Sequence, residues 1–310
     1  MLTVLQTALE VGLIYGLVAL ALFISFSILN IADLSTDGCF TLGCAVGAML
    51  TIAGHPILAL FAAMAAGMLS GYVTAFLQTR LGVESILAGI ISNTGLYTIN
   101  LAVMGFSSNV SITGVDTVFS LFKGLVGGQW SRLILLALIA AVIVIVLIRF
   151  FGTSLGLSIR ATGDSLDMVS ASSINPKATI TIGLCLANAL TALSGCLIGE
   201  YNKFCDINLG TGMVTIALAS LIIGEVFAGR RGSVGKRVVC VVLGSIVYRF
   251  IIALALRLNI SAEYFKLVSA VIVAVAIAAP NMKGYVRLAK IKSNARRLRA
   301  LSGKGDETDA

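Results

Sequence analysis

Charged side chains are scarce in this chain of 310 residues: 12% are Asp, Glu, Lys or Arg, whereas 58% are hydrophobic. Soluble domains carry about 25% charged residues, and a soluble protein of this length needs far fewer hydrophobic residues to fill its core. The apolar runs are long and continuous rather than alternating, which argues against a β-barrel. The composition therefore predicts an all-α, polytopic membrane protein.

Motifs for metal or redox chemistry are also missing. The single histidine, His55, lies in a Gly-His-Pro turn, which fits a solvated turn residue better than a ligand or a proton relay. The six cysteines form no C-x-x-C pair and fall mostly in apolar runs, where cysteine acts as a small hydrophobe. We therefore expect no metal site, no catalytic residues and no cofactor bound by this chain.

A nucleotide-binding loop is absent as well. The closest stretch is GRRGSVGKR, residues 229–237. A P-loop requires G-x-x-x-x-G-K-[ST], but here Arg230 stands at the position of the first glycine and Arg237 at the position of the hydroxyl residue. This stretch is interpreted as a basic loop.

The apolar runs predict about nine membrane spans and place residues 1–280 in one transmembrane domain. The second and seventh spans are short, which favours tilted, broken or partly re-entrant segments. The expected spans are Leu5–Leu29, Phe40–Ala53, Ile57–Leu77, Ile86–Phe106, Arg132–Phe150, Ala178–Glu200, Gly212–Ala228, Val238–Leu256 and Tyr264–Ala279.

Basic residues gather on one side of this topology. Most of the 22 Lys and Arg residues lie in alternate loops and in the tail 281–310, which explains the net charge of +8 without a nucleic-acid partner. Cytoplasmic loops are enriched in Lys and Arg. We therefore expect the N-terminus outside and a basic C-terminal tail in the cytoplasm, with Ser107–Ser131 as the longest external loop.

A mostly polar island, Thr153 to Lys177, separates two long apolar runs. Within it, the sequence predicts a short helix over Ser165–Ile174, with Asp164 as its N-cap and Asn175-Pro176 as its end. Leu166, Val169 and Ile174 give this helix a narrow apolar face. An ordinary helical loop would explain the same pattern, but so would a helix that docks on another protein.

Three stretches resemble bacterial ABC-importer permeases of the branched-chain amino acid and ribose class. The first is T-x-x-G-x-x-x-R-A-x-G, which begins at Thr153. The second is the opening Gly12–Leu20 with Leu29–Asp33, and the third runs from Gly210 to Arg230. The chain departs from the family pattern at Ser173, where glycine is usual, and at Asp164, where asparagine is common.

This resemblance implies that the polar island, residues 153–177, is the coupling segment, whose helix sits in a groove of a cytoplasmic ATPase. It also implies that ATP and Mg²⁺ bind to that partner, that an extracellular or periplasmic protein delivers the solute, and that two copies of the chain form a homodimer within the lipid of the bacterial inner membrane. The coupling residues would be Arg160, Ala161, Gly163, Asp164, Leu166, Val169 and Ile174.

Polar residues inside apolar runs are the candidates for a translocation pathway, because each is costly in lipid unless it faces protein or water. Hydrogen bonds between helices, or a polar turn near Asp33, would explain them equally well. Glu225, near basic residues Arg230 and Arg231, is interpreted as one half of a structural ion pair. The pathway candidates are Asn30, Asp33, Asn93, Thr94 and Asn188.

The function predicted from these patterns is the permease subunit of an ATP-driven importer for a small polar solute, most simply an amino acid. The Asp33-Leu34-Ser35 motif resembles the ribose-type branch and leaves sugars and nucleosides open. An ion-coupled secondary transporter is the alternative class. It would use charged residues inside the membrane, and Arg249 is the one deep candidate.

Overall fold

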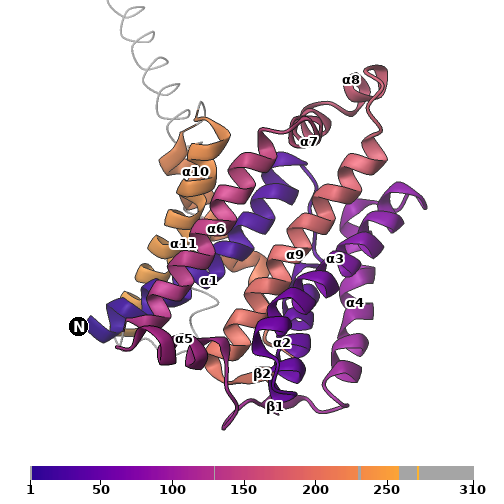
Figure 1. Ribbon diagram of the computed structural model, residues 1–310. Helices are drawn as coiled ribbons and strands as arrows, with labels where there is room; N and C mark the ends of the chain where they lie inside the picture. Colours follow the sequence, from indigo (N-terminus) through magenta and orange to yellow (C-terminus); the bar gives the residue numbers. More distant parts are fainter. Residues whose placement is uncertain (1, 129, 230–231, 258–270, 272–310) are drawn as a thin grey trace, which may run out of the picture.

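Long apolar helices cross the whole bundle in Figure 1. The computed structural model describes residues 2–128, 130–229, 232–257 and 271. Within these residues, six helical stretches are long and apolar enough to span a membrane. They are α1 (Leu2–Leu22) with the π-helix η1 (Phe23–Ile28), α3 (Pro56–Thr79), α4 (Ser85–Val103), α6 (Ser131–Phe151), α9 (Pro176–Asn202) and α11 (Val234–Arg257).

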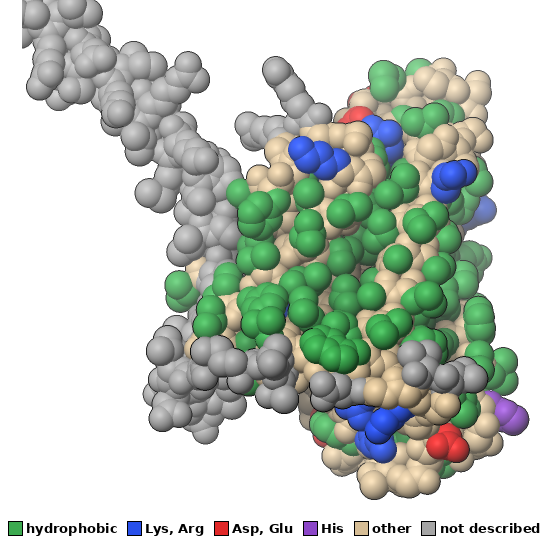
Figure 2. Space-filling model, turned by 60° about the vertical axis from the view of Figure 1, so that its left-hand side comes forward, with side chains coloured by type: hydrophobic (Ala, Val, Ile, Leu, Met, Phe, Trp, Pro, Cys, Tyr) green, Lys and Arg blue, Asp and Glu red, His purple; other side chains and the backbone are tan. Residues whose placement is uncertain are grey.

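Two shorter apolar helices, α2 (Thr36–Ile52) and α10 (Met213–Ala228), coincide with the predicted short spans. A polytopic helical protein is thus confirmed, whereas the count of nine spans is not. The ninth predicted span, Tyr264–Ala279, lies outside the described residues except for Val271. Figure 2 shows a broad hydrophobic belt on one face, with charged side chains mainly toward its two margins.

Each short helix follows an irregular segment that leads back into the bundle. Residues 29–35 connect η1 to α2, and residues 207–212 lead into α10. In Figure 1, α2 occupies the lower half of the bundle and α10 the upper half. Both are therefore half-helices that begin inside the bundle and run outward in opposite directions.

The two half-helices belong to two units of the same plan. Each unit has a long helix, an irregular segment, a half-helix and a second long helix: α1 to α3 in one, α9 to α11 in the other. The units run in opposite directions, and they interlock because α11 packs along α1 while α3 packs along α9. Inverted units of this kind are common in transporters, although the sequence shows no repeat here.

The bundle has two distinct ends. One end, called here the α7 end, carries α7 (Ser154–Asp164) and α8 (Leu166–Ala171). The other, the sheet end, carries α5 (Val118–Val126) and two antiparallel strands, β1 (Asn109–Ser111) and β2 (Phe204–Asp206).

The predicted loop Ser107–Ser131 contains regular structure at the sheet end. This stretch contains both β1 and α5. The buried carboxylate of Glu200, at the end of α9, accepts hydrogen bonds from the Val118 N–H at 2.8 Å and the Thr51 hydroxyl at 3.1 Å. Glu200 therefore ties the start of α5 and the end of α2 to α9.

Glycine allows α9 to pack in direct backbone contact with its neighbours. A Cβ added at Gly43 of α2 would lie 2.0 Å from the Ala192 carbonyl oxygen, and one at Gly67 of α3 would lie 2.4 Å from the Asn188 carbonyl oxygen. Small residues serve this purpose between membrane helices. The contacts hold α9, with Asn188 near its middle, against α2 and α3 of the other unit.

Candidate functional site

Two of the predicted pathway residues meet inside the bundle. Asp33, in the segment 29–35, is only 3% exposed, and Asn188 is 1% exposed. One carboxylate oxygen of Asp33 accepts from the Ser35 N–H at 2.9 Å and from the Ser35 hydroxyl at 2.6 Å. The other accepts from the Asn188 side-chain amide at 2.8 Å. This bond joins the segment before α2 to the middle of α9.

Asn188 has one polar atom that is not satisfied. Its amide nitrogen also donates to the Leu184 carbonyl at 3.2 Å, and its backbone carbonyl accepts from the Cys39 thiol at 3.3 Å. Its side-chain oxygen is buried without a hydrogen-bond partner within the described part of the chain. A buried acceptor without a donor costs about 1–3 kcal/mol, so this oxygen is suited to a donor that arrives from elsewhere.

The N-termini of the two half-helices are joined by a second acid. Asp37, in the first turn of α2, accepts from the N–H of Gly212 at 3.0 Å and from that of Val214 at 2.9 Å. Gly212 precedes α10 with a φ of 87° and offers no side chain as a cap. Asp37 therefore caps α10 from another helix and places its negative charge at the positive end of the α10 dipole.

The remaining pathway candidates form no hydrogen bond with the Asp33–Asn188 pair among the described residues. Asn93 of α4 is half-buried, and its side-chain oxygen faces Gly38 of α2, where an added Cβ would lie 2.6 Å from it. Thr94 is exposed and donates to the Ile90 carbonyl at 2.9 Å. Asn30 is exposed and turns the chain out of η1 with a φ of 57°.

The coupling segment contains two helices where the sequence predicted one. Thr153 caps α7, since its hydroxyl accepts from the Gly156 N–H at 3.3 Å. Helix α7 then continues through Asp164, so the prediction of Asp164 as the N-cap of the next helix is wrong. Ser165 caps α8 instead, with its hydroxyl accepting from the Met168 N–H at 3.4 Å.

Gly163 serves close packing rather than backbone freedom. A Cβ at this position would lie 1.8 Å from the Ile28 carbonyl oxygen, and Gly163 is not among the residues with positive φ. The close contact with η1, not an unusual backbone angle, therefore requires glycine at this position. Next to it, the hydroxyls of Thr162 and Thr179 are 2.8 Å apart. Helix α7 is thus fixed both to η1 and to the first turn of α9.

The predicted apolar face of α8 is divided between two surroundings. Val169 is 1% exposed and packs within the chain, whereas Leu166 is 53% exposed. Met168, which the sequence did not single out, is 58% exposed, and Ile174 is half-buried beyond the end of α8. Within α7, Arg160 and Ala161 are half-buried. Leu166 and Met168 therefore carry the apolar surface that α8 offers outward.

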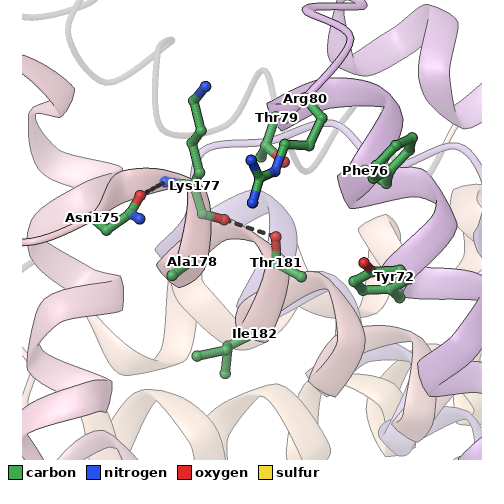
Figure 3. A pocket seen from close by; sticks show the side chains of 9 residues that line it. All are labelled: Tyr72, Phe76, Thr79, Arg80, Asn175, Lys177, Ala178, Thr181 and Ile182. Carbon is green, nitrogen blue, oxygen red and sulfur yellow. Dashed lines mark hydrogen bonds between the residues drawn. The ribbon is translucent and has the colours of Figure 1, made fainter.

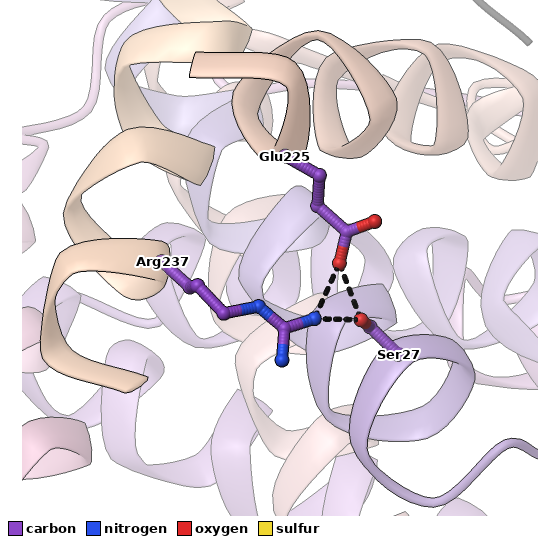
Figure 4. A network of polar contacts seen from close by, with 3 residues as sticks. All are labelled: Ser27, Glu225 and Arg237. Carbon is purple, nitrogen blue, oxygen red and sulfur yellow. Dashed lines mark hydrogen bonds and ion pairs between the residues drawn. The ribbon is translucent and has the colours of Figure 1, made fainter. Parts of the chain in front are cut away.

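A second polar network joins the two units near the α7 end. Figure 4 shows Ser27 of η1, Glu225 of α10 and Arg237 of α11 in mutual contact. The Arg237 guanidinium lies 2.7 Å from a Glu225 carboxylate oxygen and 2.6 Å from the Ser27 hydroxyl. The prediction that Glu225 forms a structural ion pair is confirmed with Arg237 as its partner; Arg230 and Arg231, which the prediction named, lie outside the described residues.

Comparison with known proteins agrees with this architecture. The family model described as "branched-chain amino acid transport system / permease component" matches residues 4–277. The tyrosine transport system permease protein of Clostridioides difficile (strain R20291) is 32% identical over 87% of this chain and 89% of its own length. An uncharacterized protein of Rickettsia prowazekii (strain Madrid E) is 31% identical over 88% of this chain and 96% of its own length. No solved structure matches the chain. The chain belongs to the family of branched-chain amino acid transport permeases.

Proposed function

We propose that this chain is the membrane-spanning subunit of an ATP-driven importer for an amino acid, with tyrosine as the first solute to test. The observation that carries the proposal is the buried Asp33–Asn188 pair beside the junction of the two half-helices. The relative from C. difficile, named for tyrosine transport, supports the choice of solute.

The polar groups at this junction fit the two charges of an amino acid. The Asp33 carboxylate and the unpaired Asn188 side-chain oxygen are acceptors for an ammonium group. The N-termini of α2 and α10 provide partial positive charge for a carboxylate. A sugar would use the same acceptors but has no need of the helix N-termini.

The buried state of Asp33 and Asn188 implies that the pathway opens by movement of the units. Helix α7 provides a direct route for such movement, because Gly163 contacts the last residue of η1. The segment 29–35 follows at once and carries Asp33. A displacement of α8 by an ATPase would therefore pass through α7 and η1 to the Asp33–Asn188 pair over a short, rigid path.

The partners follow from the two ends of the bundle. We assign the ATPase, with its ATP and Mg²⁺, to the α7 end through Leu166 and Met168 of α8. The solute-binding protein belongs at the sheet end, and a second copy of the chain completes the transporter. In this orientation the N-terminus is outside. Cysteines placed at Ser108 and Ser170 in a cysteine-free background test this, since only Ser108→Cys should react with an impermeant reagent on intact cells.

Arg249, the deep charge that suggested an ion-coupled transporter, has a structural explanation. The guanidinium carbon of Arg249 lies 3.8 Å from the centroid of the Tyr15 ring, and the side chain stacks between α11 and α1. Such a cation–π contact explains a deep arginine as a packing element.

Uptake by reconstituted vesicles tests the proposed solute and pathway. The chain is purified with the ATPase that co-elutes with it, and uptake of tyrosine, leucine, ribose and a nucleoside is measured with ATP inside or outside. We expect ATP-dependent uptake of an amino acid by the wild type and loss of this uptake in Asn188→Leu. The control variant Thr94→Val, which changes a residue that is not hydrogen-bonded to the Asp33–Asn188 pair, should transport normally. Normal uptake by Asn188→Leu would show that this pair is not part of the pathway. Uptake of ribose but of no amino acid would show that the solute is a sugar.

Substitution in α8 tests the proposed coupling separately. Leu166→Asp places a charge on the exposed apolar surface, so we expect the ATPase to dissociate or its stimulated ATP hydrolysis to stop. Ser172→Asp adds the same charge at the exposed end of α8 and should preserve both. Retention of the ATPase and of stimulated hydrolysis in Leu166→Asp would show that α8 does not couple this chain to the ATPase.

A further inference from the structure

We propose that an anionic phospholipid of the membrane leaflet at the α7 end binds in the pocket between α3 and α9. The pocket has a volume of about 310 Å³ and lies where both spans end. It is lined by the last turns of α3 and the first turns of α9 (Figure 3). The proposal requires only that the chain spans a membrane, so it stands or fails independently of the transported solute.

The polar part of the pocket is cationic. Arg80 follows the last residue of α3, and Figure 3 shows its guanidinium between α3 and α9, above Thr181. Lys177, in the first turn of α9, extends from the same rim toward the outside of the bundle. No acidic side chain lines the pocket, and neither cation forms a salt bridge with another described residue. The forked guanidinium of arginine matches a phosphate group in a bidentate manner.

The part of the pocket nearer the middle of the spans is apolar. Tyr72 lies two turns and Phe76 one turn before Arg80 on α3, with ring centroids 6.4 Å apart. They are 52% and 43% exposed, and Ile182 of α9, which also lines the pocket, is 36% exposed. The exposed side chains of Leu69 and Val73 continue this apolar face along α3.

The pocket has cations at its rim and an apolar wall of aromatic and aliphatic side chains below them. It therefore favours a ligand that has both an anionic group and an apolar part. A phospholipid meets both demands at once, because its phosphate reaches the level of Arg80 while its acyl chains run along Tyr72 and Phe76. Basic pockets between membrane helices recognise anionic headgroups in this way. A soluble anion would use only the rim, and a neutral lipid only the wall.

A lipid in this pocket would brace the coupling segment. Asn175 lines the pocket and caps α9, since its side-chain oxygen accepts from the Lys177 N–H at 3.0 Å. Helix α8 ends only a few residues earlier. Occupation of the pocket would therefore set the separation of α3 and α9 at the point where α8 connects to the bundle.

Thermal unfolding of the purified chain in detergent tests the proposal. Dioleoyl phosphatidylglycerol should raise the Tm by about several degrees, because a ligand that binds the folded state stabilises it by mass action. Dioleoyl phosphatidylcholine and glycerol 3-phosphate should not. In Arg80→Gln, the phosphatidylglycerol concentration that gives half of this shift should rise about fivefold or more, since a cation near a membrane surface contributes about that factor.

Arg149→Gln is the matched control. It removes an exposed arginine from the last turn of α6 at the same end, away from the pocket, and should respond to phosphatidylglycerol like the wild type. Lys177→Gln gives a second measure at the exposed mouth if Arg80→Gln folds poorly, and the lipid response should weaken in the same direction.

Four outcomes would overturn the proposal. Equal stabilisation by phosphatidylcholine would indicate a non-selective lipid shell, and stabilisation by glycerol 3-phosphate alone would indicate a soluble anion. An equal loss of phosphatidylglycerol stabilisation in Arg80→Gln and Arg149→Gln would indicate that the lipid responds to the overall positive charge of this end and not to the pocket. Disulfide formation between two Ile182→Cys chains in membranes would show that this face is covered by a second copy.

Discussion

The two half-helices meet at their N-termini but are held there by different means. The start of α2 is held by the segment just before it and by α9, because Asp33 accepts two hydrogen bonds from Ser35 and one from Asn188. The start of α10 has no side-chain cap of its own and depends on Asp37 of α2. Helix α2 is therefore the fixed half of the junction, and α10 is the dependent half.

This difference suggests how the junction opens. Movement of α10 away from α2 would break the bonds of Asp37 to Gly212 and Val214, while the Asp33–Asn188 bond, which joins the segment 29–35 to α9, stays intact. The freed N–H groups of α10 would then form an anion site beside the Asp33–Asn188 pair. The N-terminus of α10, which is capped by a residue of α2, is therefore the one that becomes available to a solute.

The largest effect is expected from Asp33→Leu. The change leaves the Ser35 N–H and the Asn188 amide short of an acceptor in a buried place, so stability should fall by about 3 kcal/mol or more. Thermal unfolding in detergent measures the loss. Asp33→Asn keeps an oxygen acceptor and should lose less than half as much. A Leu variant as stable as the wild type would show that α2 is not supported by this cluster.

A smaller effect is expected from Asp37→Ala. Loss of a helix cap costs about 1–2 kcal/mol, so the amides of Gly212 and Val214 should exchange with solvent about tenfold faster while amides within α2 keep their protection. Hydrogen exchange read by mass spectrometry checks this. Asp206→Ala, which removes a similar bond to the Asn208 N–H at the sheet end, is the control. Equal deprotection of α2 would contradict the distinction between the two halves.

The sequence predicts individual elements of the junction better than their contacts. The short lengths of α2 and α10 indicated broken spans, and Asp33 and Asn188 stood out as polar residues in apolar surroundings. Their hydrogen bond joins positions 155 residues apart, and no local pattern specifies such a pairing. Asp37 was not among the predicted pathway residues, and its partners are backbone amides of a distant helix, which no local pattern specifies.

The same limit explains the errors in the coupling segment. Asp164 has the residue type of an N-cap, but Ser165 has it too, and the choice between them depends on α7 continuing through Asp164 against η1. Gly163 fits both a flexible link and a close contact when only the sequence is known. The Thr117–Ser120 capping box of α5 was a local signal that could have been found within the external loop.

The ion pair near the α7 end gives a third, weaker test of how the units are joined. Arg237→Gln should lower the free energy of unfolding by about 1 kcal/mol or less, because the pair is partly exposed and screened by solvent. A double-mutant cycle with Glu225→Gln measures the coupling between the two side chains. A cost as large as that of Asp37→Ala would mean that the units are held together mainly at the α7 end.

The smallest effect, and the only gain, is expected from Ser173→Gly. Ser173 and Asn30 both leave a helix in the left-handed region, with φ of 60° and 57°, one before α9 and the other before α2. Asparagine adopts this conformation readily, whereas for other residues it costs about 1–2 kcal/mol. Glycine removes that cost at Ser173 but loses more conformational entropy on folding.

The net result at Ser173 should be a rise in Tm of about 1–2 °C. At Asn30 the conformational cost is already low, so Asn30→Gly should lower the Tm slightly through the entropy of the unfolded chain. Thermal unfolding of the two variants side by side distinguishes the signs. A loss of stability in both would mean that the Ser173 side chain contributes a contact that offsets its backbone strain, and the two helix exits would then be equivalent.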